Sequence, residues 1–218
     1  MHVNDLSGRA QDYLKVLWDL EELHGAPTPM REITHRVDQK ASTATEAIKR
    51  LDAAGLVTHI PYTGVSLTDA GRVLAVQMVR RHRLAESLLV TVMGYTWDEV
   101  HDDAEILEHA MSDIFIDRVD SLLGYPTRDP HGDPIPRADG VTEPLSQVTL
   151  AEVGHQEVTV EQVSDLDPEV LRTLFDVGVV PGARVAVRSR DGDTCSLAVN
   201  GADVVVPAHI LQEIRVIP

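Results

Sequence analysis

Cysteine is almost absent from this chain, since Cys195 is the only one in 218 residues. A single cysteine excludes an intramolecular disulfide, which fits a reducing compartment. The same scarcity argues against a closed structural zinc site, because such sites are usually built on several thiolates.

Long hydrophobic segments are missing as well. No apolar run approaches the roughly 20 residues that a membrane-spanning helix needs. Residues 1–7 also lack the basic stretch and apolar run of a secretory signal. Hydrophobic side chains still make up 43% of the chain, which is enough for a sizeable core. We expect a globular, cytoplasmic protein with no membrane partner.

Positive charge is scarce, because 19 Lys and Arg stand against 35 Asp and Glu and give a net charge of −16. Taken alone, such an acidic surface argues against a nucleic-acid partner, since duplex DNA repels it. The charges are unevenly distributed, however. Residues 28–85 hold nine Lys or Arg against five Asp or Glu, a net charge of +4 that leaves −20 for the remainder. A locally basic module on an acidic body is compatible with DNA binding, and the acidic remainder attracts cations.

Helical periodicity dominates the first half of the chain. We predict a first helix that ends at Gly25, a short second helix from Pro29, and a third helix that Ser42 caps and Gly55 closes. Residues 57–67 are expected to form a small hairpin. This order of elements is typical of a winged helix-turn-helix.

The remainder divides into a helical part and a strand-rich part. A long helix is expected from Thr68 to about Met93, and a further helical stretch from 97 to 123. Residues 127–146 are rich in Pro, Gly and Asp and are interpreted as a linker. Five short strands then suggest a small β-barrel with one helix at 167–177, the strands being expected at 158–160, 184–189, 196–199, 204–206 and 213–217. The predicted fold is mainly α with a small all-β C-terminal domain.

The third helix presents polar groups on its outward face, while Ala44, Ile48 and Leu51 fall on its inward face. A recognition helix reads base edges from its first turns and touches phosphates with longer cationic side chains. The residues predicted to contact DNA are Ser42, Thr43, Thr45 and Glu46 at base edges, with Lys49 and Arg50 at phosphates. The alternative is a helical hairpin with an ordinary polar surface.

Metal-ligating residue types recur at helical spacing. Glu105, Glu108 and His109 stand at i, i+3 and i+4, which would place two carboxylates and an imidazole on one helical face. Hard oxygen donors with one or two imidazoles suit manganese or ferrous iron. Each such pair, taken singly, is also what a solvated helix surface carries.

Further residues of the same types accompany this cluster. His82 and Glu86 form an i, i+4 pair one helix earlier, and His101 precedes Glu105 by one turn. Asp12 is an acid beside the apolar stripe of the first helix. Clustered carboxylates repel one another without a cation, so metal would tie the first helix to the later one and act as a switch.

Five stretches of the sequence carry a resemblance to a known family. They are residues 11–15 (QDYLK), 67–72 (LTDAGR), 79–86 (VRRHRLAE), 97–109 (WDEVHDDAEILEH) and 129–136 (DPHGDPIP). With these stretches the chain resembles the diphtheria toxin repressor family, and within it the manganese-dependent regulators of metal transport from actinobacteria. The resemblance covers nearly the whole chain.

The resemblance implies a homodimeric transcriptional repressor that binds double-stranded operator DNA when it is loaded with metal. It implies a winged helix-turn-helix DNA-binding domain in residues 1–75, a helical metal-binding and dimerisation domain in 76–140, and an SH3-like, FeoA-like domain in 141–218. By position, the activating site would consist of Asp12, Glu105, Glu108 and His109. A second site would consist of His82, Glu86 and His101, completed by His131 and by Asp165. Gln162 or Asp167 are alternatives to Asp165, and Asp129 is a weaker candidate.

The resemblance also bears on which metal is bound. Iron-sensing members have a cysteine where this chain has Glu105 and a methionine where it has Asp12. Both replacements are hard oxygen donors, which favours Mn(II), with Fe(II), Co(II) or other divalent metals as substitutes. Small manganese-sensing members without the C-terminal domain have a glutamate where this chain has Lys15, so their two-metal arrangement is not expected here.

Three alternatives remain beside a manganese-dependent repressor. The first is an Fe(II)-dependent repressor of the same family, and the second is a DNA-binding protein that does not respond to metal. The third is a metalloenzyme, because a His and carboxylate cluster also activates water. No His-Glu-x-x-His motif and no separate base or nucleophile is present, and the DNA-reading module would be unexplained. We therefore expect no enzymatic activity.

Overall fold

The computed structural model describes all 218 residues and divides into two compact units. The first unit comprises residues 1–82, 106–117 and 135–143, and the second comprises 83–105, 118–134 and 144–218. The three-domain boundaries expected from the sequence differ from this division and stay a prediction. None of the helices combines the length and the apolar character that crossing a bilayer requires.

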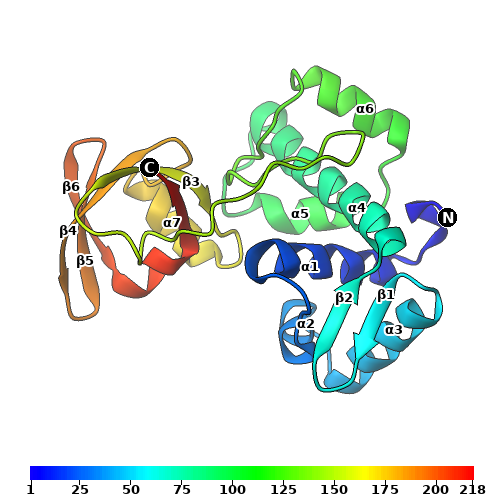
Figure 1. The fold of residues 1–218 in the computed structure, drawn as a ribbon. Coiled ribbons are helices and arrows are strands. Elements are labelled where there is room, and N and C mark those ends of the chain that lie inside the picture. The colour runs from blue at the N-terminus through cyan, green and yellow to red at the C-terminus, as the bar shows by residue number, and fades with distance from the viewer. The chain divides into compact units, whose positions relative to one another are not determined.

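The first unit contains a winged helix-turn-helix, as predicted (Figure 1). Its elements are the 3₁₀ turn η1 (Val3–Asp5), the helices α1 (Gly8–His24), α2 (Met30–Arg36) and α3 (Ala41–Ala53), and the strands β1 (Val57–Ile60) and β2 (Gly64–Leu67). The two strands pair antiparallel as the wing. One apolar core joins these elements, because each helix buries a single face against it.

The capping prediction for α3 is wrong. The helix begins at Ala41 after Lys40, which makes no side-chain capping hydrogen bond. Ser42 therefore lies inside the first turn with an exposed side chain rather than at the cap. The inward face is as predicted, since Ala44 and Ile48 are buried. The spacing of the buried apolar residues therefore predicts the inward face of this helix, whereas the residue with the strongest capping preference does not mark where the helix begins.

The helical segments after the wing are interrupted at positions where the prediction had continuous helix. Helix α4 (Asp69–Leu88) starts after Thr68, whose Oγ1 accepts a hydrogen bond from the Gly71 amide at 3.1 Å, and it continues as a π-helical turn η2 (Leu89–Met93). The single helical stretch predicted for 97–123 is instead two helices, α5 (Val100–Leu107) and α6 (Asp113–Leu122).

The break between α5 and α6 changes the position of two candidate ligands. Glu108 and His109 lie beyond the last residue of α5, so the prediction of one shared helical face is wrong. The amide of Ala110 bonds the carbonyl of Leu107 at 2.9 Å and tightens the chain into a turn. Ser112 then opens α6, because its Oγ accepts from an amide in the first turn of that helix.

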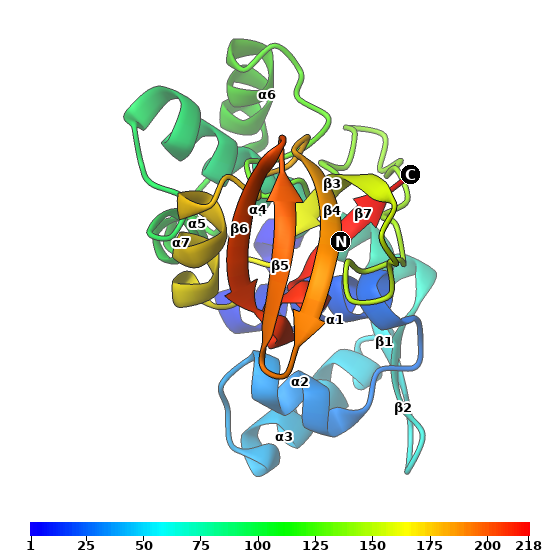
Figure 2. The ribbon, with the colours of Figure 1, turned by 90° about the vertical axis from the view of Figure 1, so that its left-hand side faces the viewer.

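The second unit contains an antiparallel five-stranded sheet of the SH3-like type, which confirms the predicted all-β domain. Its strands are β3 (Glu157–Val163), β4 (Arg184–Asp191), β5 (Thr194–Val199), β6 (Ala202–Pro207) and β7 (Ile214–Ile217), in the order β6-β5-β4-β3-β7. Figure 2 shows β5 between β4 and β6. Register shifts in β3 and β4 mark bulges, which bend a sheet. The edge strands β6 and β7 are not paired with each other.

A helix and a 3₁₀ turn complete this domain. Helix α7 (Pro168–Asp176) follows β3 and is capped by Asp167, and the 3₁₀ turn η3 (Ala208–Glu213) joins β6 to β7. Alternate residues of the strands face one apolar core, to which α7 contributes Leu171 and Leu174. The loop between β3 and α7 is therefore held at both ends, and it carries a candidate metal ligand, Asp165.

Replacement of Gly71 by alanine tests the junction between the wing and α4. A Cβ at Gly71 would lie 1.8 Å from the carbonyl oxygen of Leu56, which is backbone and has little freedom to move. We expect Gly71→Ala to lower the free energy of unfolding by about 2 kcal/mol or more, measured by urea unfolding in chelator. Gly154→Ala is the control, since a Cβ there meets nothing within 4 Å. Equal stability of the two variants would contradict the close approach.

Candidate metal centres

The first cluster joins helix α1 to the turn after α5. Asp12 lies in α1, and its Oδ1 is 3.0 Å from Nε2 of His109. The same nitrogen is 3.9 Å from Oε1 of Glu108. One ligand atom from each of the three residues lies within 4.8 Å of the other two. Two carboxylates and one imidazole thus converge closely enough to share a single cation.

Glu108 is the most constrained member of this cluster. It is fully buried, and Nζ of Lys15 donates to both of its carboxylate oxygens at 2.8 Å. Nδ1 of His82 is 2.6 Å from Oε2 of the same carboxylate. Burial alone would raise the pKa of Glu108, but the charges and hydrogen bonds of Lys15 and His82 hold it below the ordinary value. Glu108 is therefore an ionised carboxylate that is not exposed to solvent.

Gln11 positions the His109 ring. Its Oε1 lies 2.7 Å from Nδ1 of His109, and its Nε2 donates to the carbonyl of Val3 at 2.9 Å. Because the amide oxygen can only accept, Nδ1 carries the hydrogen and Nε2 is left to face Asp12. The sequence prediction assigned no role to Gln11. The sequence feature that could have indicated this role is a polar residue, Gln11, next to Asp12 on the buried side of α1.

Glu105, the fourth residue predicted for the activating site, belongs to the second unit. It lies in the last turn of α5, and its Oε1 is 3.6 Å from Nε2 of His101. Within the first unit, the structure brings together Asp12, Glu108 and His109. It gives Glu105 a contact with a residue predicted for the second site.

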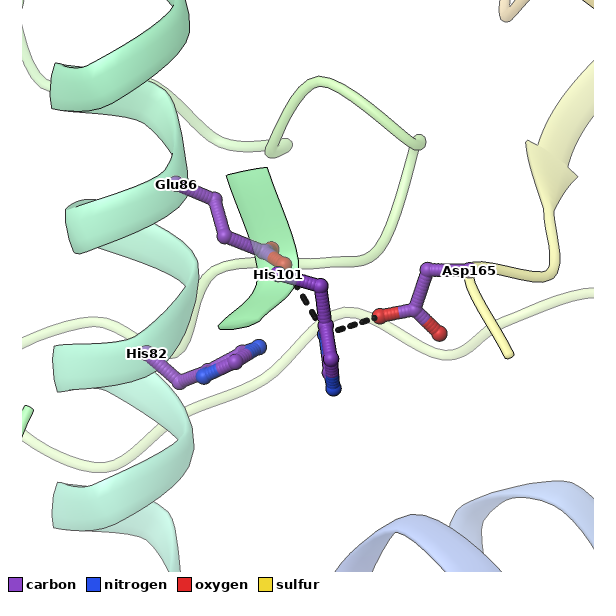
Figure 3. A group of neighbouring side chains, drawn as sticks. All are labelled: His82, Glu86, His101 and Asp165. Atoms are coloured by element: carbon purple, nitrogen blue, oxygen red, sulfur yellow. Dashed lines mark hydrogen bonds and ion pairs between the residues drawn. The ribbon is translucent and has the colours of Figure 1, made fainter. Parts of the chain in front are cut away.

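The second cluster gathers residues from three elements of the second unit. Figure 3 shows Glu86 reaching from α4 and Asp165 from the loop after β3, both toward the ring of His101 in α5. Nδ1 of His101 lies 3.1 Å from Oδ2 of Asp165 and 3.4 Å from Oε1 of Glu86. His82 lies one helical turn before Glu86 on α4. The predicted contribution of a C-terminal acid to the second site therefore has a geometric basis.

The two carboxylates determine the charge of His101. Burial alone would lower the pKa of its imidazole, but the hydrogen bonds and charges of Asp165 and Glu86 raise it to about 11. The same contact with His101 holds the pKa of Asp165 below its ordinary value, against the effect of burial. The acids thus favour a cationic partner, and the imidazole must lose its proton before it can bind a metal ion.

His131 lies in the predicted linker and is fully buried. Its Nε2 is 3.1 Å from the carbonyl oxygen of Trp97 and donates to it, which leaves Nδ1 facing Oε2 of Glu86 at 3.8 Å. Nδ1 has no hydrogen-bond partner. Burial alone would lower the pKa of His131, but Glu86 raises it to about 10. Residues 127–146, which were predicted to be a linker, thus include a buried segment that supplies a candidate ligand.

Among the other candidates, Asp129 has a carboxylate oxygen within 4.8 Å of ligand atoms of Glu86 and His131, while Gln162 and Asp167 have different partners. Oδ1 of Asp129 accepts from the amides of His131 and Asp133 at 2.9 Å, and burial raises the pKa of Asp129 well above its ordinary value. The Gln162 amide donates to Oδ2 of Asp133 at 3.3 Å, and Asp167 caps α7. Of the three C-terminal candidates, Asp165 is the one that faces His101.

The donor atoms in both clusters are carboxylate oxygens and imidazole nitrogens. Cys195 lies in β5 with its side chain buried in the core, where its Sγ is 3.8 Å from a backbone carbonyl oxygen. Nδ1 of His131 is buried 3.8 Å from Oε2 of Glu86 without a hydrogen bond, and a bound cation satisfies a buried polar atom of this kind. The residues present therefore fit a hard or borderline divalent cation, and they do not provide a thiolate site.

Helix α3 exposes most of the residues predicted to contact DNA. Ser42, Thr43, Glu46, Lys49 and Arg50 are exposed. Thr45 is half-buried, and its hydroxyl donates to the carbonyl of Ala41 at 2.7 Å. Lys49 and Glu46 pair with each other at 2.8 Å. The outward face of the helix is therefore polar and accessible, and one of its cations is already partnered by an acid.

Comparison with protein families matches almost the entire chain. Residues 5–65 match the iron-dependent repressor N-terminal DNA-binding domain. Residues 68–137 match the iron-dependent repressor metal-binding and dimerisation domain. Residues 145–218 match the FeoA domain.

Individual relatives agree with this assignment over more than nine-tenths of their length. The iron-dependent repressor IdeR of Mycobacterium tuberculosis is 34% identical over 95% of this chain and 92% of its own. The diphtheria toxin repressor of Corynebacterium diphtheriae is 30% identical over 98% of this chain and 99% of its own.

Two solved structures are similar in fold as well as sequence. A manganese-dependent transcriptional repressor in complex with manganese has a TM-score of 0.88 and 43% identity, covering 95% of this chain and 99% of the other. The repressor ScaR with bound Zn²⁺ has a TM-score of 0.80 and 33% identity, covering 95% and 98%. These similar proteins are transcriptional repressors and not enzymes.

The role of Gln11 can be tested with two variants. Gln11→Met removes both the acceptor and the donor of the amide, and we expect it to weaken Mn(II) binding by about 10- to 100-fold, measured by isothermal titration calorimetry. Gln11→Glu keeps an acceptor oxygen for His109 and should keep or raise the affinity. Equal losses in both variants would mean that Gln11 does not act through His109.

Proposed function

The chain belongs to the family of iron-dependent repressors that includes the diphtheria toxin repressor, and from this we propose that it represses genes of metal transport and homeostasis as a cytoplasmic, Mn(II)-activated homodimer that binds operator DNA. The observation that carries the proposal is the convergence of Asp12 on α1 with Glu108 and His109. In this proposal residues 1–75 read DNA, residues 76–140 bind metal and dimerise, and residues 141–218 form the third domain.

Manganese is favoured over iron by the chemistry of the donor atoms. The activating site would consist of Asp12, Glu105, Glu108 and His109, and the second of His82, Glu86, His101, His131 and Asp165. None of these offers sulfur, and oxygen donors suit manganese better than thiolates do. The similar solved structure that contains manganese supports the same choice. Iron remains the alternative, because the curated relatives include iron-dependent repressors.

Helix α1 connects the activating site to the DNA-reading elements. Asp12 lies in its first half, and Glu21 lies near its end. Oε1 of Glu21 accepts from the amide of Leu67 in the wing at 2.8 Å, and the other oxygen pairs with Arg72 at the start of α4. When Asp12 is tied to Glu108 and His109, α1 is fixed, and the wing is fixed with it. A bound cation thereby favours the arrangement of the winged helix that fits the operator.

The DNA contacts in this proposal come from α3. Ser42, Thr43, Thr45 and Glu46 face base edges, and Lys49 and Arg50 face phosphates. The locally basic composition of residues 28–85 supports this assignment, because the acidic remainder of the chain repels DNA.

An apolar face on α6 supports the homodimer. Ile114, Phe115 and Leu122 are exposed on this helix, and Ile106 is exposed at the end of α5. Exposed large apolar side chains are typical of a surface that another protein covers. The dimerisation-domain match over residues 68–137 includes all four.

Metal dependence and selectivity are tested together on an operator selected from random duplex DNA. We expect chelator to weaken operator binding by about 100-fold, and Mn(II) to give tighter binding than Fe(II), Co(II) or Zn(II), measured by anaerobic fluorescence anisotropy. Glu105→Cys should weaken activation by Mn(II) and strengthen activation by Co(II) or Fe(II), since it replaces a hard oxygen by a thiolate.

The matched control for this experiment is Glu169→Cys, which makes the same change at an exposed position on α7. Operator binding that survives chelator would refute the metal switch. Tighter operator binding with Fe(II) than with Mn(II) would identify iron rather than manganese as the activating metal. An unchanged order of metals in Glu105→Cys would remove Glu105 as the residue that sets selectivity.

The dimer surface is tested by placing a charge on it. Phe115→Glu should convert most of the protein to monomer at micromolar concentration, because a buried carboxylate at an interface has no partner there. Light scattering after gel filtration measures the mass. Ser121→Glu adds the same charge at an exposed polar position of α6 and should leave the dimer intact. If Phe115→Glu is still a dimer, the dimer interface does not include Phe115.

A further inference from the structure

Lys15 is a buried cation inside the activating cluster. It lies on α1, three residues after Asp12, and its side chain is 5% exposed. Its Nζ donates to both oxygens of Glu108 at 2.8 Å and is 3.3 Å from Nδ1 of His82. Lysine is rarely buried to this extent unless it is paired with an acid. Here the acid is a candidate metal ligand.

The carboxylate of Glu108 faces the ammonium group of Lys15 and the imidazole nitrogens of two histidines. Its Oε1 lies 3.9 Å from Nε2 of His109, which belongs to the activating cluster. Its Oε2 lies 2.6 Å from Nδ1 of His82, and Lys15 spans both oxygens. A fully buried carboxylate is costly unless a positive charge compensates it. Lys15, whose Nζ lies 2.8 Å from the carboxylate, supplies a positive charge of this kind.

We propose that Lys15 is a built-in counter-cation that competes with the divalent ion for Glu108 and so sets how much metal the activating cluster needs. The inference rests on the proposed function, because the ion is the one that Asp12, Glu108 and His109 would share. An oxygen that accepts a hydrogen bond from an ammonium group is a weaker donor to a second cation. Lys15 must therefore loosen its hold on Glu108 when the ion enters, and its charge repels the ion as well.

Competition between Lys15 and the metal ion predicts a combination of stability and affinity changes that a purely structural role would not give. A lysine that only supports the fold would, when removed, lower both the stability of the metal-free protein and its affinity for metal. A competing counter-cation would, when removed, lower the stability of the metal-free protein and raise the affinity for metal. The two measurements change in opposite directions only in the second case.

The experiment compares Lys15→Met with the wild-type protein. Methionine is close to lysine in length and lacks the charge. Mn(II) affinity is measured by calorimetry on the full-length protein, and stability is measured by urea unfolding in chelator. Lys40→Met is the matched control, because it removes the same charge from the same unit at an exposed position on the N-terminal side of α3. It tests whether overall charge alone changes the affinity.

We expect Lys15→Met to bind Mn(II) about tenfold more tightly or better, the scale of a charge-assisted hydrogen bond, and to unfold at lower urea in chelator. Lys40→Met should bind as the wild type does. An unchanged or weaker Mn(II) affinity in Lys15→Met would overturn the inference and leave the proposed function standing. A wild-type protein that binds no divalent ion would overturn both.

A second pair of variants covers the case in which Lys15→Met does not fold. Glu108→Gln leaves Lys15 buried without its carboxylate and should unfold at lower urea than the wild type. Adding Lys15→Met to Glu108→Gln should then raise the unfolding midpoint again, because the uncompensated cation is gone. A double variant no more stable than Glu108→Gln would overturn the pairing on which the inference depends.

Discussion

The buried carboxylate of Glu108 is the interaction on which the first unit depends. Three segments that are distant in the sequence converge on it: α1 through Lys15, α4 through His82, and the turn after α5 through Glu108 itself. A charge buried this deeply is tolerated only where every direction around it offers a hydrogen-bond donor or a cation. The requirement to compensate one negative charge therefore holds these segments together, and the residues that do so are the ones that metal chemistry also needs.

The same helix that compensates Glu108 also carries the contact to the wing. Asp12 and Lys15 lie in one half of α1, while Glu21, near the other end, bonds the amide of Leu67 and pairs with Arg72. The helix is packed into the apolar core between these two ends, so a displacement at one end cannot be absorbed in the middle. Under the proposed function, a change of charge at this cluster would reach the wing through one helix.

Much of this architecture could be predicted from the sequence because it follows from apolar periodicity. The helices of the winged domain, the wing and the five strands lie where alternating or helical spacing indicated them. The break between α5 and α6 was not predicted, because no Gly or Pro marks it and Ser112 opens the new helix by a local hydrogen bond. The start of α3 was predicted wrongly because Ser42 has a strong capping preference but lies inside the helix.

Most candidate ligands were predicted from residue type, and His131 and Asp165 from the family resemblance, but the supporting groups were not predicted. Gln11 and Lys15 owe their roles to burial beside His109 and Glu108, and burial arises from tertiary contacts that a single sequence does not reveal. The choice of Asp165 rather than Gln162 likewise depended on the loop after β3.

The composition of the two clusters also determines how the protein responds to oxidants. A thiolate ligand passes through sulfenic to sulfinic and sulfonic acid when peroxide is present, and at the later stages the change is irreversible. Carboxylates have no corresponding ladder, and the single thiol of this chain, Cys195, is 1% exposed in an apolar core. These candidate donor groups therefore keep their chemistry under conditions that oxidise thiols.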